Sequence, residues 1–128
     1  MIVEDIDFSG HFVDPQSNAL DRYHELYCAT VRRRGGDPNI GPKLPVLLKN
    51  SGFLDVRTSV VSADEFSWRG ETHKSLTMEN IADAAIAEGL TTAEEVAEIV
   101  DSLYEYAQDP ETFSGLPRVV QAWGRRRL

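Results

Sequence analysis

The sequence has little of what would point to several common protein classes. It contains one cysteine, Cys28, so it can form no intrachain disulfide and no thiolate metal cluster. No apolar run approaches the roughly 20 residues that are needed to span a bilayer. The first residues lack the basic and apolar regions of a signal peptide. We therefore expect a cytoplasmic protein that does not act at a membrane.

Basic residues are also scarce. The chain has 13 Lys and Arg residues against 21 Asp and Glu residues, a formal net charge of −8. This balance argues against binding to nucleic acid, where Lys and Arg must meet phosphates. Two arginine clusters, at 32–34 and 125–127, depart from the pattern. Each follows a predicted element, where cations suit a helix C-terminus or a solvated tail, so we expect no nucleic-acid partner.

The remaining composition is that of an ordinary globular chain. Its 128 residues are 41% hydrophobic and 27% charged. This length predicts one domain, 1–128, which can bury one core without disulfides or metal. No internal repeat or low-complexity stretch is present.

The first half of the chain alternates strands and helices. Residues 2–8 read as a strand that ends at Ser9-Gly10, and we expect that in an ancestral protein another segment preceded it. A helix begins at Ser17 or Asn18 and ends at Gly35-Gly36. A short helix over about 41–51 and a strand over 53–61, rich in β-branched residues, complete this half.

The second half is mainly helical. Residues 62–75 are polar and form a loop or an extended segment. A helix over 78–88 begins after Thr77, and a second helix runs from about 92 to 108, where Thr91 and Thr92 precede Glu94 and Glu95 by three residues each, as in a capping box. A loop then leads to a last strand over 118–123. Residues 62–117 therefore form a loop and helical insertion before that strand.

Four stretches, 3–7, 34–41, 44–53 and 118–124, follow one another in an informative order. Together with the order strand, helix, helix, strand, helical insertion, strand, they resemble the carboxyl half of a class I S-adenosylmethionine-dependent methyltransferase. The resemblance covers essentially the whole chain. It implies an α/β fold: a truncated Rossmann-like, three-stranded mixed sheet with about four helices, in which 118–123 lies antiparallel between 2–8 and 53–61.

The resemblance does not extend to the family's donor site. That site is built from the first four strands, beginning with a glycine-rich turn, and no Gly-x-Gly-x-x-Gly motif occurs here. Gly35-Gly36 ends a helix instead of following a strand. We therefore expect this chain alone to hold no cofactor, whereas the full-length family uses S-adenosylmethionine.

Candidate substrate contacts are few. Asp7, Phe8 and His11 follow the first strand, and the carboxyl ends of strands in open α/β sheets commonly face the ligand crevice. Tyr27 and Trp68 could line a pocket for a small-molecule methyl acceptor. Each has a plainer alternative: a solvated loop for the first group and packing for the aromatic residues. No catalytic, cofactor-binding or metal-binding residue is predicted.

Two hypotheses of function follow. In the first, the chain is a methyltransferase-like domain that lacks the S-adenosylmethionine-binding half and is inactive unless another chain supplies it. In the second, it is a non-catalytic binding or assembly module. The first strand would leave an exposed edge, which predicts a homodimer that pairs there about a two-fold axis. An independent small enzyme is a third, weaker alternative.

Overall fold

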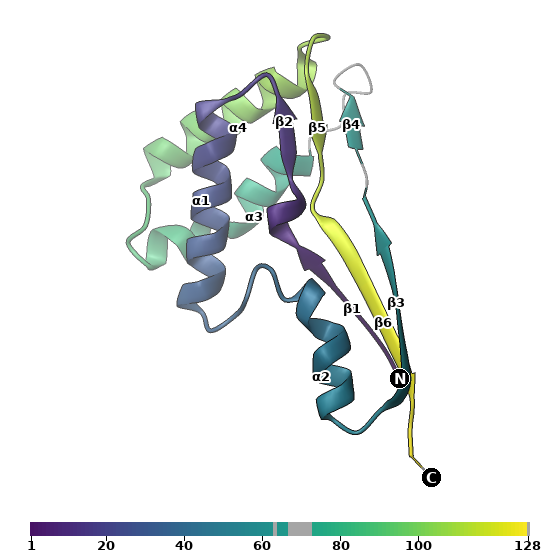
Figure 1. Cartoon of the computed structure of the whole chain (residues 1–128). Coiled ribbons are helices and arrows are strands. Elements are labelled where there is room, and N and C mark those ends of the chain that lie inside the picture. The colour runs from purple at the N-terminus through teal and green to yellow at the C-terminus, as the bar shows by residue number, and fades with distance from the viewer. Residues whose placement is uncertain (63, 67–72, 128) are drawn as a thin grey trace. The chain divides into compact units, whose positions relative to one another are not determined.

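The computed structural model describes residues 1–62, 64–66 and 73–127. They form two compact units: unit 1 comprises Met1–His11, Pro38–Ala63 and Gly115–Leu128, and unit 2 comprises Phe12–Asp37 and Asp64–Ser114. The elements, labelled in Figure 1, are β1 (Ile2–Asp7), η1 (Phe8–Gly10), β2 (Phe12–Asp14), α1 (Asn18–Arg33), η2 (Gly41–Lys43), α2 (Leu44–Asn50), β3 (Leu54–Val61), β4 (Asp64–Phe66), α3 (His73–Ala87), α4 (Ala93–Gln108), β5 (Phe113–Gly115) and β6 (Arg118–Arg125).

Unit 1 is built on a three-stranded sheet in the order β1-β6-β3. The last strand, β6, pairs antiparallel with both neighbours, so that Ala122 lies opposite Val3 on one side and Thr58 on the other. The expected placement of the last strand between the other two is confirmed. The expectation of a mixed sheet is wrong, because a central strand that is antiparallel to both neighbours leaves no parallel pair.

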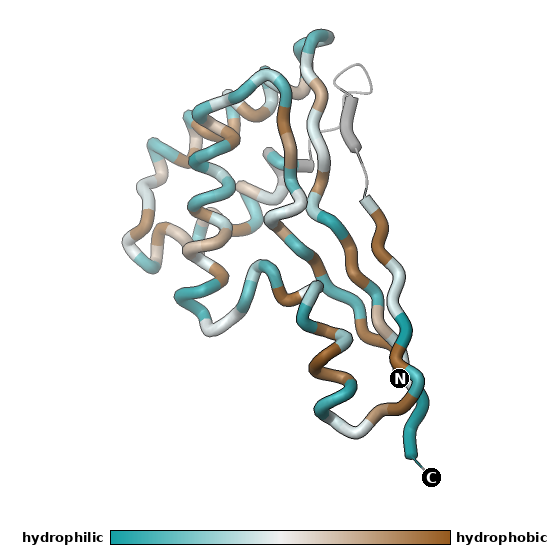
Figure 2. Tube along the Cα trace, viewed as in Figure 1, coloured by the Kyte–Doolittle hydropathy of each residue, from teal (hydrophilic) through white to brown (hydrophobic). Residues whose placement is uncertain are grey.

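Helix α2 and the short 3-10 helix η2 cover one face of this sheet, which we call the α2 face. Side chains alternate between faces along a strand, and the register places these residues together on the α2 face: Val3, Asp5, Asp7, Thr58, Val60, Arg118, Val120 and Ala122. Gly41 of η2 is buried and packs against β1 and β6. In Figure 2, hydrophobic residues occupy much of α2 and of the sheet, whereas the C-terminal end is hydrophilic.

The Gly41→Ala substitution tests this close packing. A Cβ at this position would lie 2.9 Å from the Ile6 carbonyl oxygen and 3.0 Å from Val120 Cγ2. Since the nearest atom belongs to the backbone, we expect the free energy of unfolding to fall by about 1–3 kcal/mol. Urea unfolding measures the change. Adding Val120→Ala should not restore the stability, and a loss below about 0.5 kcal/mol would contradict the packing.

Unit 2 contains helices α1, α3 and α4, which pack against one another. Two predicted helix starts are confirmed. The Ser17 side chain accepts a hydrogen bond from the Leu20 amide, and the Thr92 side chain accepts one from the Glu95 amide. These caps satisfy amides that have no partner inside the helix. A small sheet in the order β2-β5-β4 accompanies the helices.

An ion pair connects α1 with the start of α4. The Arg22 guanidinium lies 2.9 Å from the Glu95 carboxylate and also donates to the Leu90 carbonyl. The Thr91 hydroxyl donates to the same carboxylate at 2.6 Å. The hydrogen bonds from Arg22 and Thr91 lower the pKa of Glu95, and the bond to Glu95 raises the pKa of Arg22. Glu95 therefore serves this network instead of closing the capping box on Thr92.

The Glu95→Gln variant should weaken the acid dependence of stability. Because the pKa of Glu95 is lowered from about 4.5 in the folded chain, its contribution is present above that value and is lost as pH falls through the lowered pKa. Both side chains are about one-third exposed, which limits the effect to below about 1 kcal/mol. Urea unfolding at pH 7 and pH 3.5 measures it. Glu94→Gln, in the same helical turn, is the control, and an equal response from both variants would contradict the assignment.

Several local predictions need correction. Helix α3 begins at His73 and not after Thr77; Lys74 is buried and donates a hydrogen bond to Ser114, so a tertiary contact holds the first turn. Strand β2 lies between the first predicted strand and the first predicted helix, where no element was predicted, and β5 lies in the loop expected before the last strand. Both strands are too short to show a period of two. The short helix predicted over about 41–51 is present as η2 and α2, and its residue Leu47 is 46% exposed although it is apolar.

Candidate functional site

A cavity of about 230 Å³ lies on the α2 face of the unit 1 sheet, at the end of β1. The strands supply its floor and the first residues of η2 and α2 supply a wall. Its lining combines one ion pair and one hydroxyl with proline and valine side chains: Asp7, Arg118, Thr58, Pro42, Pro45, Val60 and Val120.

The register of the sheet explains why residues so distant in sequence meet here. Asp7 at the end of β1 pairs with Arg118 at the start of β6, and Val60 of β3 pairs with Val120 of β6. All four lie on the α2 face. On each strand they are an even number of residues from the row formed by Val3, Ala122 and Thr58, and side chains at even spacing share a face. The cavity therefore forms where β1 ends and β6 begins.

Asp7 is the only carboxylate among the described residues that line this cavity, and it is held by two partners. It is 4% exposed. The Ser9 hydroxyl donates to its Oδ1 at 2.5 Å, and Arg118 Nη2 lies 2.8 Å from its Oδ2. A buried carboxylate requires such compensation, since an unpaired charge in an apolar setting is strongly unfavourable. The side chain is thus locked in place with its charge balanced.

Arg118 is positioned by Gly10 as well as by Asp7. A Cβ at residue 10 would lie 2.5 Å from Arg118 Nε and 2.8 Å from its Cγ. The arginine therefore crosses the backbone at the end of β1, where only glycine leaves room. Its side chain is 45% exposed, so the guanidinium faces solvent on one side and Asp7 on the other.

This arrangement suits binding better than proton transfer. The carboxylate and the guanidinium offer an acceptor and donors side by side, and the proline and valine side chains add apolar walls. The volume lies below the 300–1,000 Å³ of typical ligand pockets, so the cavity fits a small polar group. Asp7 is already engaged by Arg118, and the lining residues that the structure describes include no histidine or cysteine that could act as a base or nucleophile.

Of the predicted substrate contacts that the structure describes, only one lines the cavity. Asp7 lines the cavity, whereas Phe8 is 1% exposed and buried in the core. The half-buried His11 ring packs against Phe8 with 5.0 Å between ring centroids. Tyr27 belongs to unit 2, where its ring lies 6.5 Å from that of Tyr23. Trp68 lies outside the described residues.

Sequence reasoning missed Arg118, Thr58 and the two prolines of the cavity. Arg118 was assigned only as the first residue of a strand. The sequence held one indication of the Asp7–Arg118 pair: the last strand was expected to lie antiparallel beside the first, so an arginine at its start could fall opposite an aspartate at the end of β1. That inference needed the register, which local sequence does not provide.

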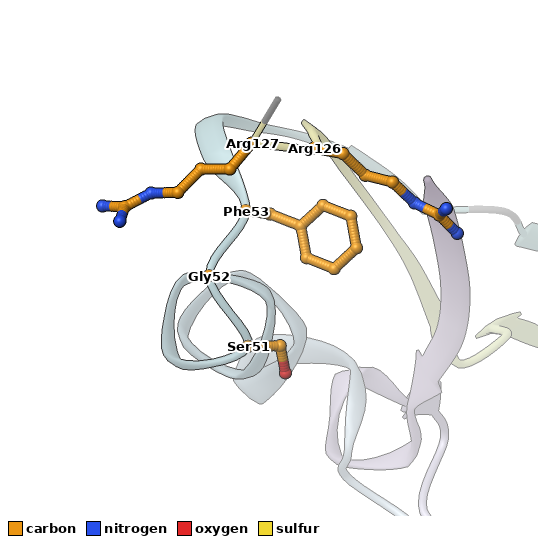
Figure 3. Close-up of a pocket in the computed structure, with 5 residues that line it drawn as sticks. All are labelled: Ser51, Gly52, Phe53, Arg126 and Arg127. Carbon is orange, nitrogen blue, oxygen red and sulfur yellow. The ribbon is translucent and has the colours of Figure 1, made fainter.

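A second cavity, of about 440 Å³, lies where α2 ends. It is lined by Ser51, Gly52, Phe53, Arg126 and Arg127. Figure 3 shows the two arginine side chains extending to opposite sides of the Phe53 ring. Their guanidinium groups do not converge on one point, so they form no clamp for a single anion.

Other reactive groups favour structural roles. Cys28 is buried in α1, and burial raises the pKa of its thiol, which disfavours the nucleophilic thiolate. Among the described residues, no group of three or more His, Cys, Asp or Glu side chains is placed to hold a metal ion. Within the same residues, no helix combines the length and apolar character that crossing a membrane requires.

Comparisons with known proteins leave the family open. No protein-family model matches the chain, and a search of curated proteins finds no significant match.

Proposed function

We propose that this chain is the substrate-side half of a Rossmann-like, class I methyltransferase-type fold, and that the Asp7–Arg118 cavity receives a small methyl acceptor. The observation that carries the proposal is the strand order β1-β6-β3 with an antiparallel central strand. It agrees with the order of the last three strands that the sequence resemblance implies.

The described residues do not fit the methyl donor, S-adenosylmethionine. The family's donor site requires a glycine-rich turn directly after a strand. Here Gly35 and Gly36 follow α1, and Gly41 packs tightly against Ile6 and Val120. Another polypeptide segment would have to supply the donor site, and the chain alone is expected to be inactive.

The role of this half would be to hold the acceptor. Methyl transfer needs little acid–base chemistry, but it needs the acceptor held in line at short range. An amine or hydroxyl of the acceptor would donate to Asp7 or accept from Arg118, while Val60 and Val120 exclude water from the apolar side. The paired charges of Asp7 and Arg118 would orient the acceptor without becoming part of the reaction.

Two titrations test this proposal. Isothermal titration of the chain with S-adenosylmethionine should give no binding heat, and measurable affinity would contradict a missing donor site. Ethanolamine, which carries an amine and a hydroxyl, should shift the methyl resonances of Val60 and Val120 in NMR spectra. Asp7→Asn should weaken this response at least severalfold, whereas Asp5→Asn, an exposed neighbour outside the cavity, should not. Unchanged valine signals in the wild type would overturn the acceptor site.

A second candidate function is a non-catalytic homodimeric binding or assembly module. The observation in its favour is that β1 is an edge strand of the unit 1 sheet. Unpaired edge amides and carbonyls are a template for pairing with another chain. Multi-angle light scattering across a range of concentrations tests it, and a constant monomer mass at high concentration would rule out the homodimer.

A further inference from the structure

The outer edge of β1 exposes a defined set of backbone groups. Met1 and Gly124 exchange both of their hydrogen bonds, with N···O distances of 3.1 Å. In an antiparallel pair such exchanging positions alternate along the strand. Val3, Asp5 and Asp7 therefore bond to β6, whereas the amides and carbonyls of Ile2, Glu4 and Ile6 point away from it.

The chain itself closes the far part of this edge. The Ile6 amide donates to the Asp5 carboxylate at 2.8 Å, and the Phe8 amide donates to the Pro38 carbonyl at 3.1 Å. The Ile6 carbonyl oxygen packs against Gly41. In the described structure, the part of the edge that remains open consists of the amides and carbonyls of Ile2 and Glu4.

We propose that two copies of the chain pair through β1, antiparallel, about a two-fold axis at Val3. This inference rests on the second candidate function and gives it a register. Ile2 of one copy would lie opposite the partner's Glu4, and Glu4 opposite the partner's Ile2. Each of these two pairs exchanges two backbone hydrogen bonds, so all four open amides gain an acceptor. The two sheets would join into one sheet of six strands.

Other two-fold registers use the edge less well. An axis at Glu4 places the two Glu4 side chains directly opposite each other, where like charges repel. An axis at Asp5 does the same for the two Asp5 side chains. Both registers also require the Ile6 amide, which Asp5 already occupies. An axis at Ile2 leaves the Glu4 groups unpaired.

The side chains at the proposed axis are suited to contact. Val3 is half-buried and would meet the partner's Val3 across a non-hydrogen-bonded pair, where side chains come closest. Ile2, which is 67% exposed, would be covered in part by the stem of the partner's Glu4. The register thus buries apolar surface and places no like charges opposite each other.

A cysteine cross-link tests the register. The Cα atoms of a non-hydrogen-bonded antiparallel pair lie about 4.5 Å apart, within the range that a disulfide spans. Val3→Cys, made with Cys28→Ala, should form a covalent dimer under mild oxidation at micromolar concentration. Val61→Cys in the same background is the control, since it is 59% exposed on the other edge strand, β3. Equal cross-linking of the two variants would overturn the register.

A charge pair at the same position gives a second test that does not depend on oxidation. Ile2→Lys places a cation opposite the partner's Glu4 twice per dimer. We therefore expect the dissociation constant of the dimer to fall about threefold to tenfold in sedimentation measurements. Ile2→Glu places like charges there and should raise the dissociation constant by a similar factor. A dimer that responds equally to both changes would refute this register while the homodimer stands. A wild type that stays monomeric would refute both.

Discussion

Replacing Phe8 with alanine is expected to lower the free energy of unfolding by about 3–5 kcal/mol. Phe8 is 1% exposed and is among the largest fully buried side chains of the described chain. Its ring lies against that of His11, and its amide donates to the Pro38 carbonyl. Truncation would remove these ring contacts and leave a cavity beside the end of β1, where Asp7 is positioned.

Urea unfolding monitored by far-UV circular dichroism measures the Phe8 effect. Phe8→Leu keeps most of the apolar volume and should lose less than half as much stability as Phe8→Ala. Phe12→Ala is the matched control: that ring is 48% exposed and contacts Phe113, so a loss of about 1 kcal/mol or less is expected. If Phe8→Ala lost no more than Phe12→Ala, the packing role of Phe8 would be refuted and a ligand contact would become the better interpretation.

Replacing Leu26 with alanine should be the most damaging comparable change in unit 2. Leu26 is 1% exposed in α1, the helix that packs against α3 and α4. Leucine-to-alanine changes at such positions reduce the free energy of unfolding by about 2–5 kcal/mol, because the transfer energy of the lost methyl groups adds to that of the cavity.

The control for Leu26 is the same substitution on a helix surface. Leu47 of α2 is 46% exposed, and Leu47→Ala should change stability by less than about 0.5 kcal/mol. Urea midpoints and slopes of both variants provide the comparison. Similar losses at the two positions would show that Leu26 is not part of a tightly packed core, and a changed slope for Leu26→Ala alone would indicate that the two units no longer unfold together.

The methyltransferase-type arrangement and the homodimer both use the outer edge of β1, so one molecule cannot adopt both at the same time. In the methyltransferase-type arrangement, the donor-binding half would add a strand beside β1. In the homodimer, the partner's β1 occupies that position. We therefore expect a variant that strengthens the dimer, such as Ile2→Lys, to bind a supplied donor half less well. The open groups of Ile2 and Glu4 are the shared determinant.

Sequence reasoning placed most of the regular elements because their signals are local. The start of α1 at Asn18 and of α4 at Ala93 follow from Ser17 and Thr92, whose side chains cap the next turn of the chain. The start of α3 could not be found in this way, because the burial of Lys74 and its bond to Ser114, 40 residues away, decide it. Strands β2 and β5 were not predicted, because three residues are too few to show a period of two.

The candidate site was predictable only in part. Asp7 could be chosen because it ends a strand, and it lines the cavity. Phe8 follows it directly and satisfied the same rule, yet its ring turns into the core. Position along a strand end does not distinguish a side chain that faces a cavity from one that faces the interior, since that depends on what packs against each face.

By itself, the sequence determined where the chain forms helices and long strands, because caps, glycines and apolar spacing act over a few residues. The tertiary structure alone decided that Asp7 meets Arg118, 111 residues further along, and that α2 covers the face on which they meet. Strand register is the physical reason: a shift of one residue would move every side chain to the other face of the sheet, and long-range pairing sets that register.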